Sequence, residues 1–162
     1  MGQLSDQQRK ALMEELAGLK RFALSLANDS HDAEDLLHLT VERVLERGMP
    51  ADAHVAKWSY RVCRNIWLDE LRSREVRNRY VATAVATEAG PAISVEDGLG
   101  RLELERVDAA MQALPEEQRS ALLLVAVEGR SYAEVSEILD IPLGTVMSRV
   151  ARARRGLAEK LE

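Results

Sequence analysis

The segment from Glu128 to Arg155 constrains the fold of this chain most, because its residues predict a helix, a tight turn and a second helix. Ser131 and Glu134 have the spacing of a capping box, in which the hydroxyl accepts an orphan backbone N–H and the carboxylate reaches back. Asp140-Ile141-Pro142 ends the first helix, since the residue before a proline is pushed out of the α region. Pro142 is also preset to open a new helix. The segment therefore predicts a helix-turn-helix, whose second helix can enter a DNA major groove.

The second helix of this segment has one apolar face and a basic remainder. Val146, Val150, Ala153 and Leu157 recur at helical spacing and are expected to be buried. The other faces carry Thr145, Met147, Ser148, Arg149, Arg152, Arg154 and Arg155. The alternative interpretation is an ordinary helical hairpin with a solvated basic face.

Composition narrows the class of protein. The 162 residues include 22 basic and 27 acidic ones, for a net charge of −5, yet basic residues gather between Lys57 and Arg79. Such segregated charge is compatible with nucleic-acid binding by an acidic chain. The lone Cys63 excludes an internal disulfide and suits a reducing cytosol. No apolar run approaches the roughly 20 residues of a membrane span, and no signal peptide is visible, so a cytoplasmic protein without membrane insertion is expected.

Catalytic and metal-binding patterns are missing from the sequence. It has no Gly-rich phosphate loop, nucleophile motif or pair of catalytic acids. The histidines at positions 31, 38 and 54 lack further ligands at metal-binding spacing. We therefore expect no cofactor and no metal, and an enzyme is the least favoured class.

Apolar periodicity predicts an all-α fold of two small helical domains. A first amphipathic helix is expected from the spacing of Leu12, Leu16, Leu19, Ala23 and Leu26. A second is expected to start at Ser30 as N-cap and to bury Ala33, Leu36, Leu37, Val41, Val44 and Leu45. A third is expected to turn inward Val55, Trp58, Val62, Ile66 and Leu71. Residues 81–100, rich in Ala, Thr, Gly and Pro, are expected to be a flexible linker between a domain at 1–80 and a helix-turn-helix domain at 101–162.

The third helix carries a basic stripe. Lys57, Arg61, Arg64 and Arg72 follow at spacings of 4, 3 and 8, which place them along one face, flanked by Asn65 and Asp69. Trp58, Tyr60 and Trp67 interleave with them. Basic residues with aromatics can hold a phosphate backbone and stack unpaired bases. The alternative is a solvated helix face with Trp58 in the core.

The two modules together resemble the extracytoplasmic-function (ECF) sigma factors of bacterial RNA polymerase. The resemblance to sigma region two rests on Asp32-Ala33-Glu34-Asp35-Leu36, Trp58-Ser59-Tyr60-Arg61-Val62-Cys63-Arg64-Asn65 and Leu68-Asp69-Glu70-Leu71-Arg72. The resemblance to region four rests on Leu114-Pro115-Glu116-Glu117-Gln118-Arg119, Ser131-Tyr132-Ala133-Glu134-Val135 and the run from Gly144 to Arg154. Both sets occur in order across the linker.

The resemblance implies a role for each module. The expected polymerase-binding residues, facing the clamp helices of the largest subunit, are Glu34, Asp35, His38 and Glu42. The expected readers of a strand-separated −10 element are Lys57, Arg61, Arg64, Asn65, Asp69 and Arg72. The expected readers of a duplex −35 element are Arg130, Ser131, Thr145, Met147, Ser148, Arg149, Ala151, Arg152 and Arg155. It further implies contact with the flap of the second-largest subunit, regulation by an anti-sigma factor, and a monomer when free.

Three positions depart from the family pattern. A glutamine is usual where His38 stands, and a basic residue is usual where Met147 stands. A large apolar residue is usual where Ser59 stands, so looser packing is expected around Ser59. Two rival hypotheses remain open. One is a stand-alone repressor or activator, although no dimerisation segment is evident. The other is a sigma-like decoy that binds a regulator but not DNA, which His38 and Met147 motivate.

Overall fold

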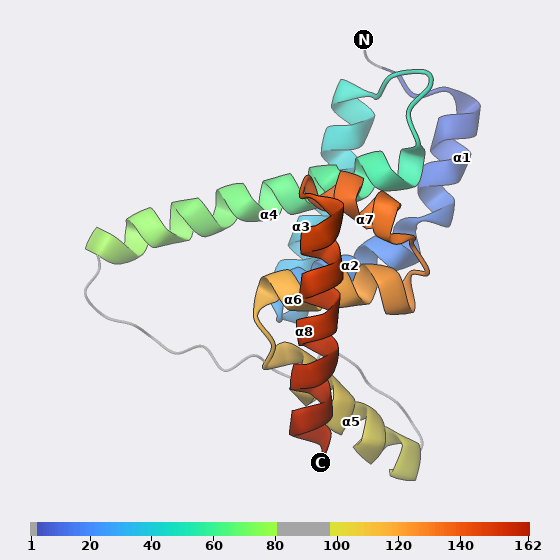
Figure 1. The fold of residues 1–162 in the computed structure, drawn as a ribbon. Helices are drawn as coiled ribbons and strands as arrows, with labels where there is room; N and C mark the ends of the chain where they lie inside the picture. Colours follow the sequence, from blue (N-terminus) through green and yellow to red (C-terminus); the bar gives the residue numbers. More distant parts are fainter. Residues whose placement is uncertain (1–2, 81–97) are drawn as a thin grey trace.

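The computed structural model describes residues 3–80 and 98–162, which form helices and short loops with no strand in either range. Figure 1 shows the helices in chain order. They are α1 (Asp6–Glu14), α2 (Leu16–Ala27), α3 (Ser30–Arg47), α4 (Val55–Tyr80), α5 (Gly98–Gln112), α6 (Glu116–Leu122), the π-helical turn η1 (Leu123–Val127), α7 (Tyr132–Leu139) and α8 (Leu143–Leu161). The predicted all-α fold is confirmed. Of the predicted linker, residues 81–97 lie outside the described residues, and residues 98–100 already belong to α5.

The first module, α1 to α4, differs from the prediction at its start. The single helix expected from Leu12 to Leu26 is wrong: the chain breaks at Glu15, between α1 and α2. Glu15 has φ −92° and ψ −3°, and its N–H donates to the carbonyls of both Ala11 and Leu12. The break redirects the chain while keeping Leu12 and Leu26 in one core. It also places the Glu15 side chain at a joint, where it is free to reach a distant element.

Helix α3 begins one residue earlier than expected. Asp29, not Ser30, is the N-cap, and its carboxylate accepts a hydrogen bond from Asp32 N at 3.0 Å. A carboxylate at this position also complements the positive end of the helix dipole. Leu45, expected to be buried, is 44% exposed, because α3 turns Thr40 and Val44 toward the core instead.

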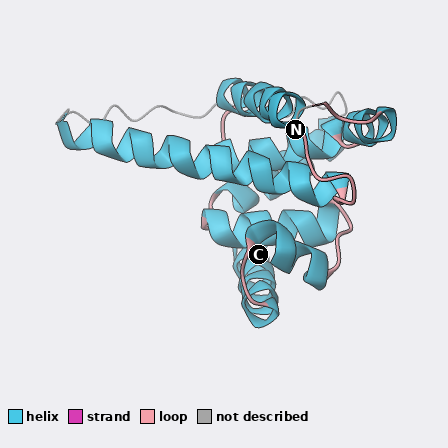
Figure 2. Ribbon diagram, turned by 90° about the horizontal axis from the view of Figure 1, so that it is seen from above, coloured by secondary structure: helices cyan, strands magenta, loops and turns pink. Residues whose placement is uncertain are grey.

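Helix α4 buries only part of the face predicted: Ile66 is buried, and Val55 and Val62 pack against the core, as expected. Trp58 and Leu71, expected inward, are 37% and 38% exposed, whereas Tyr60, Cys63 and Trp67 are buried. The physical reason is that α4 packs against α1, α2 and α3 together. Its buried face is therefore wider than predicted and includes Tyr60, Cys63 and Trp67. Its C-terminal part runs on past the other helices (Figures 1 and 2).

The looser packing expected at Ser59 is not found. Ser59 is fully buried, and its hydroxyl donates to the carbonyl of Val55 at 2.7 Å. A small residue with its polar group satisfied within the helix fits a close contact between helices. The departure from a large apolar residue is therefore compatible with a close-packed core.

The second module, α5 to α8, contains the predicted helix-turn-helix. Ser131 and Glu134 form the expected capping box at the start of α7. Asp140 ends α7 in the left-handed region at φ 55°, and Val146, Val150 and Ala153 of α8 are buried as predicted. The π-helical turn η1 was not predicted, since its run of apolar residues fits an ordinary buried helix equally well.

The two modules pack against each other. Helix α2 lies against α6, and α4 lies against α7, as the two views in Figures 1 and 2 agree. Buried apolar residues of both modules form one continuous cluster. The second module therefore covers part of the surface of the first.

Candidate nucleic-acid interface

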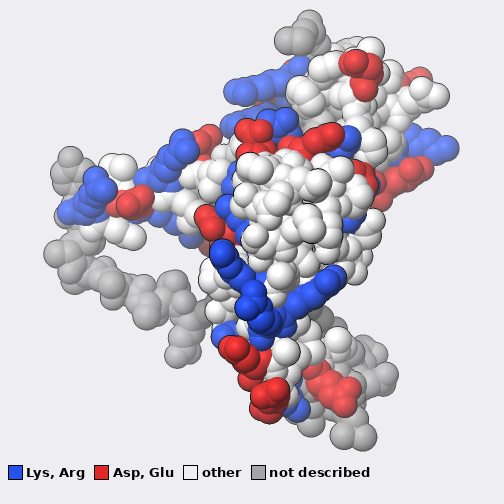
Figure 3. Space-filling view, viewed as in Figure 1, with Lys and Arg blue, Asp and Glu red and all other residues white. Residues whose placement is uncertain are grey.

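Helix α8 presents the candidate −35 residues on the side opposite its core. Because Val146, Val150 and Ala153 face inward, most residues between them face solvent, whereas Arg149 is largely buried. The exposed members of the predicted set are Met147, Ser148, Ala151, Arg152 and Arg155. Figure 3 shows Lys and Arg side chains gathered over the middle of α8, at the front of the molecule. A basic helix face with solvent access on this side has the form of a recognition helix.

A cleft of about 470 Å³ separates the start of α8 from the start of α6. Thr145, Ser148, Arg149 and Arg152 line it from α8 and the turn before it, opposite Glu117 of α6. Arg149 Nη2 lies 3.7 Å from a carboxylate oxygen of Glu117; the Arg149 side chain is 18% exposed and that of Glu117 64%. An ion pair this long, with one partner exposed, contributes little stability. Arg149 is therefore available to exchange Glu117 for a phosphate.

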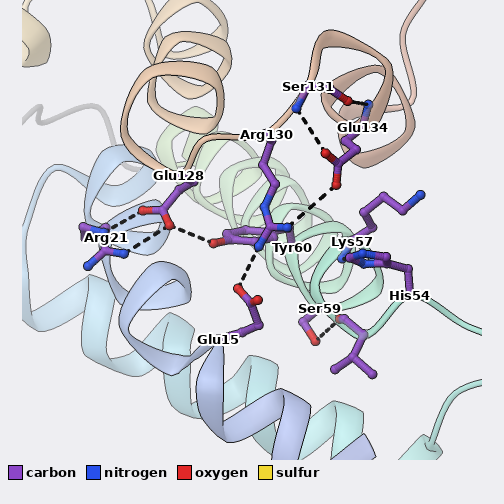
Figure 4. A network of polar contacts seen from close by, with 11 residues as sticks. Glu15, Arg21, His54, Lys57, Ser59, Tyr60, Glu128, Arg130, Ser131 and Glu134 are labelled. Atoms are coloured by element: carbon purple, nitrogen blue, oxygen red, sulfur yellow. Dashed lines mark hydrogen bonds and ion pairs between the residues drawn. The ribbon is translucent and has the colours of Figure 1, made fainter.

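Arg130 and Ser131 lie apart from the other candidate −35 residues. The guanidinium of Arg130 points into the first module, donates to Glu15 Oε2 at 2.9 Å and covers the ring of Tyr60 at 5.7 Å (Figure 4). Only 17% of its side chain is exposed. Ser131 uses its hydroxyl to accept from Glu134 N. In this arrangement neither side chain lies on the α8 face.

The pKa values at this contact reflect its burial. Burial is the first cause that raises the pKa of Tyr60, and the carboxylates of Glu128 and Glu15 add to it. For Arg130, burial by itself lowers the pKa, but the hydrogen bond and charge of Glu15 outweigh it and the net shift is upward. Arg130 thus stays a cation and Tyr60 a neutral phenol in this cluster.

Helix α4 exposes most of the candidate −10 residues. Arg61, Asn65, Asp69 and Arg72 are exposed and Arg64 is half-buried, on the side away from Tyr60, Cys63 and Trp67. Arg72 Nη1 lies 3.7 Å from a carboxylate oxygen of Asp69, one turn earlier. Trp67 and Tyr60, two of the three aromatics considered for base stacking, are buried. Trp58 remains half-open to solvent on the same helix.

Lys57 and Arg61, at the start of this face, meet carboxylates of the second module. Lys57 Nζ lies 2.5 Å from Glu137 Oε2, and Arg61 Nη2 lies 4.0 Å from Asp140 Oδ2. Both acids come from α7 or its C-cap. The basic face of α4 is thus partly occupied within the chain itself.

The candidate polymerase-binding residues share one exposed face of α3. Glu34, Asp35, His38 and Glu42 are all exposed, and their spacing puts them on one side of the helix. Leu39, beside them, is 49% exposed. Acidic side chains around an open leucine can hold a basic, partly apolar helix of another protein.

Arg119 and Glu128 are structural residues that sequence reasoning missed. Arg119 is 5% exposed and donates to carbonyls at the C-terminal ends of α2 and α5. Glu128 accepts two hydrogen bonds from Arg21, at 2.6 and 3.1 Å. The Arg119–Ser25 and Glu128–Arg21 pairings have no local sequence signal, because each joins the two modules. The only available hint was the place of Arg119 within the family motif.

Two further properties apply to the part of the chain that the structure describes. None of its helices combines the length and apolarity needed to cross a membrane. Within residues 3–80 and 98–162, no group of three or more His, Cys, Asp or Glu side chains could hold a metal ion.

Comparisons with known proteins agree with this arrangement. Residues 12–77 match the family model of Sigma-70 region 2, and residues 104–157 match that of Sigma-70 region 4. The ECF RNA polymerase sigma factor EcfG of Rhodopseudomonas palustris is 32% identical over 160 residues, which cover 98% of this chain and 87% of the relative. The ECF RNA polymerase sigma factor SigM of Mycobacterium tuberculosis is 34% identical over 146 residues, covering 88% and 71%.

Solved structures extend the likeness to the whole fold. The sigma factor RpoE from Bartonella quintana, in complex with the anti-sigma factor NepR, gives a TM-score of 0.84 at 25% identity, covering 97% of this chain and 98% of that one. CnrH, in complex with the cytosolic domain of CnrY, gives 0.66 at 22% identity, covering 95% and 86%, and supports the fold. Both modules, their order and their packing are thus matched together, and the chain belongs to the ECF family of RNA polymerase sigma factors.

Proposed function

We propose that this sigma factor directs core RNA polymerase to promoters through two separate DNA contacts, one on α4 and one on α8. The observation that supports this most strongly is that one chain carries both basic helix faces, each within the matching sigma region. A stand-alone repressor would need only the helix-turn-helix and would leave the face of α4 unexplained. The chain makes and breaks no covalent bond in this role.

The second module positions the complex on duplex DNA. We infer that α8 enters the major groove at the −35 element, with Ser148, Arg149 and Arg152 at the bases or phosphates. Met147, 51% exposed, cannot donate a hydrogen bond and would offer apolar contact to a thymine methyl. Arg130 and Ser131 could join this surface only after the contact with the first module opens.

The first module holds the −10 element as single strands. Opening a base pair loses about 1.4 kcal/mol of stacking per step, which must be offset by contacts to the separated strand. Arg61, Arg64 and Arg72 supply cations along α4, and Asn65 supplies an amide for a base edge. Lys57 would join them once it leaves Glu137.

RNA polymerase is the partner that both DNA contacts require. We infer that Glu34, Asp35, His38 and Glu42 on α3 bind the clamp helices of the largest subunit, and that the second module meets the flap of the second-largest. A cytoplasmic location follows from that partner. We also infer an anti-sigma partner; the support is that the solved neighbour RpoE is described in a complex with the anti-sigma factor NepR. We further infer that the chain is a monomer in the free state.

The test is promoter-specific transcription with purified core polymerase on promoters recovered after overexpression of the chain. The wild type should give a defined transcript, and the double variant Arg61→Ala/Asn65→Ala should lose open-complex formation. Lys10→Ala, at an exposed basic residue of α1, is the matched control and should behave as wild type. No defined transcript from the wild type would refute the proposal. Polymerase capture without DNA binding by either module would favour a decoy instead.

A further inference from the structure

Ion pairs link the two modules at several positions among the described residues. On the first module Arg21, Lys57 and Arg61 are basic, and they face three acids of the second. Those acids are Glu128, Glu137 and Asp140. In the pair Arg130–Glu15 the charges are reversed: the second module supplies the cation and the first module the carboxylate. The charges are complementary, as at an interface that is selected for docking.

Packing around Gly18 of α2 shows that this contact is closely fitted. A Cβ at Gly18 would collide with Tyr60 Oη and would lie 2.7 Å from a carboxylate oxygen of Glu128, closer than real Cβ atoms approach. The absence of a side chain at Gly18 therefore lets Glu128 sit between Arg21 and Tyr60, whose hydroxyl donates to it at 3.3 Å. The Glu128 side chain is only 6% exposed as a result.

Tyr60 joins this contact to the nucleic-acid face of α4. Its ring meets Phe22 edge-on at 5.2 Å within the first module, and the guanidinium of Arg130 covers it from the second (Figure 4). Lys57 and Arg61, on the same helix within one turn of Tyr60, are the residues paired with the acids of α7. The carboxylate of Glu137 therefore occupies Lys57, a cation that the proposed function assigns to the bound strand.

We propose that the free chain is autoinhibited: its second module docks on α2 and α4 through Glu128 and Glu137, and single-stranded DNA reaches Lys57 only after the modules separate. The inference rests on the role given to α4 under Proposed function. The strand and Glu137 of α7 compete for Lys57, so Lys57 cannot hold both at once. Polymerase or DNA binding must then supply the free energy that separates the modules.

Glu128→Arg tests this docking most directly. The change places a cation against Arg21 in a confined site, and it should expand the chain in small-angle X-ray scattering of the free protein. Glu159→Arg, an equal charge change at an exposed position of α8, should leave the radius of gyration unchanged. The double variant Arg21→Glu/Glu128→Arg restores opposite charges and should return the radius toward the wild-type value.

Binding of a fluorescein-labelled oligothymidylate provides the functional measurement. If the open form is about a tenth of the wild-type population, complete opening raises the apparent affinity about tenfold. Glu128→Arg should show this gain over Glu159→Arg, which has the same net charge, and the double variant should lose it. Equal radii, or equal affinities in the two charge-matched variants, would overturn the proposal. If transcription with core polymerase is nevertheless promoter-specific, the proposed function survives; if no form transcribes, the proposed function itself fails.

Discussion

Replacing Arg119 by alanine is expected to lower the free energy of unfolding by about 3 kcal/mol, although Arg119 is charged and lies outside both proposed DNA contacts. Its guanidinium donates to the carbonyl of Ser25 through Nε, and through Nη1 to those of Gln112 at 3.2 Å and Leu114 at 3.0 Å. Ser25 lies in the last turn of α2, and Gln112 ends α5. One cation thus caps two helix C-termini, one from each module, where carbonyls lack intrahelical partners.

The magnitude follows from those three carbonyls. Each buried acceptor left without a donor costs about 1–3 kcal/mol, and the lower bound over three acceptors gives the value of about 3 kcal/mol. Burial of Arg119 opposes the stabilisation that its hydrogen bonds provide, because burial disfavours the charged guanidinium and lowers its pKa; the charge of Glu116 acts the other way. The net effect should still be destabilising, because alanine also leaves a cavity where the side chain was.

Urea unfolding followed by circular dichroism measures the effect. With a slope of about 2 kcal/mol per molar urea, a loss of about 3 kcal/mol lowers the midpoint by about 1.5 M. Arg154→Ala, at an exposed position of α8, is the control and should change stability by less than about 0.5 kcal/mol. A loss below about 1 kcal/mol for Arg119→Ala would refute the reasoning, since even one orphaned carbonyl costs that much.

Two further predictions concern the helix-turn-helix. Arg152→Ala should weaken binding to a −35 duplex and reduce the slope of log affinity against log salt by about one unit, because one phosphate contact is lost; an unchanged slope would assign Arg152 to the solvated face. Ser131→Ala should destabilise the chain by about 1 kcal/mol through loss of the bond to Glu134 N, as thermal unfolding would measure. Ser131→Asp, which keeps an acceptor at the cap, should recover most of that stability, and equal losses in both variants would contradict the capping role.

The helix-turn-helix could be predicted closely from sequence because its signals are local. The capping box at Ser131, the stop at Asp140 and the stripe of Val146 and Val150 each depend on residues within a few positions. Helix α4 was predicted less well because its buried face depends on which helices surround it. Trp58 and Leu71 have the spacing of buried residues, but packing against α1, α2 and α3 buries Tyr60 and leaves both of them exposed.

The candidate sites divide in the same way. The exposure of Met147, Ser148 and Arg152 follows from the apolar periodicity of α8 alone. The exposure of Asp35 and His38 follows in the same way from the apolar periodicity of α3. Arg130, however, has the same local signal as a DNA-binding arginine and lies against Glu15. No local pattern distinguishes a cation that meets phosphate from one that meets a carboxylate of another module.

Local signals were enough to predict the helix-turn-helix with its cap at Ser131, the order of the two modules and the family, because these depend on short-range backbone preferences and on motifs of fixed spacing. Only the tertiary structure decided that the modules close on each other, that Arg119 caps a helix in each of them, and that Lys57 and Arg61 are paired with acids of α7. The contacts between modules join residues far apart in sequence: Lys57 and Glu137 are 80 positions apart, and Arg119 and Ser25 are 94. Ion pairing and burial depend on distance in space, which residue spacing within one helix cannot encode.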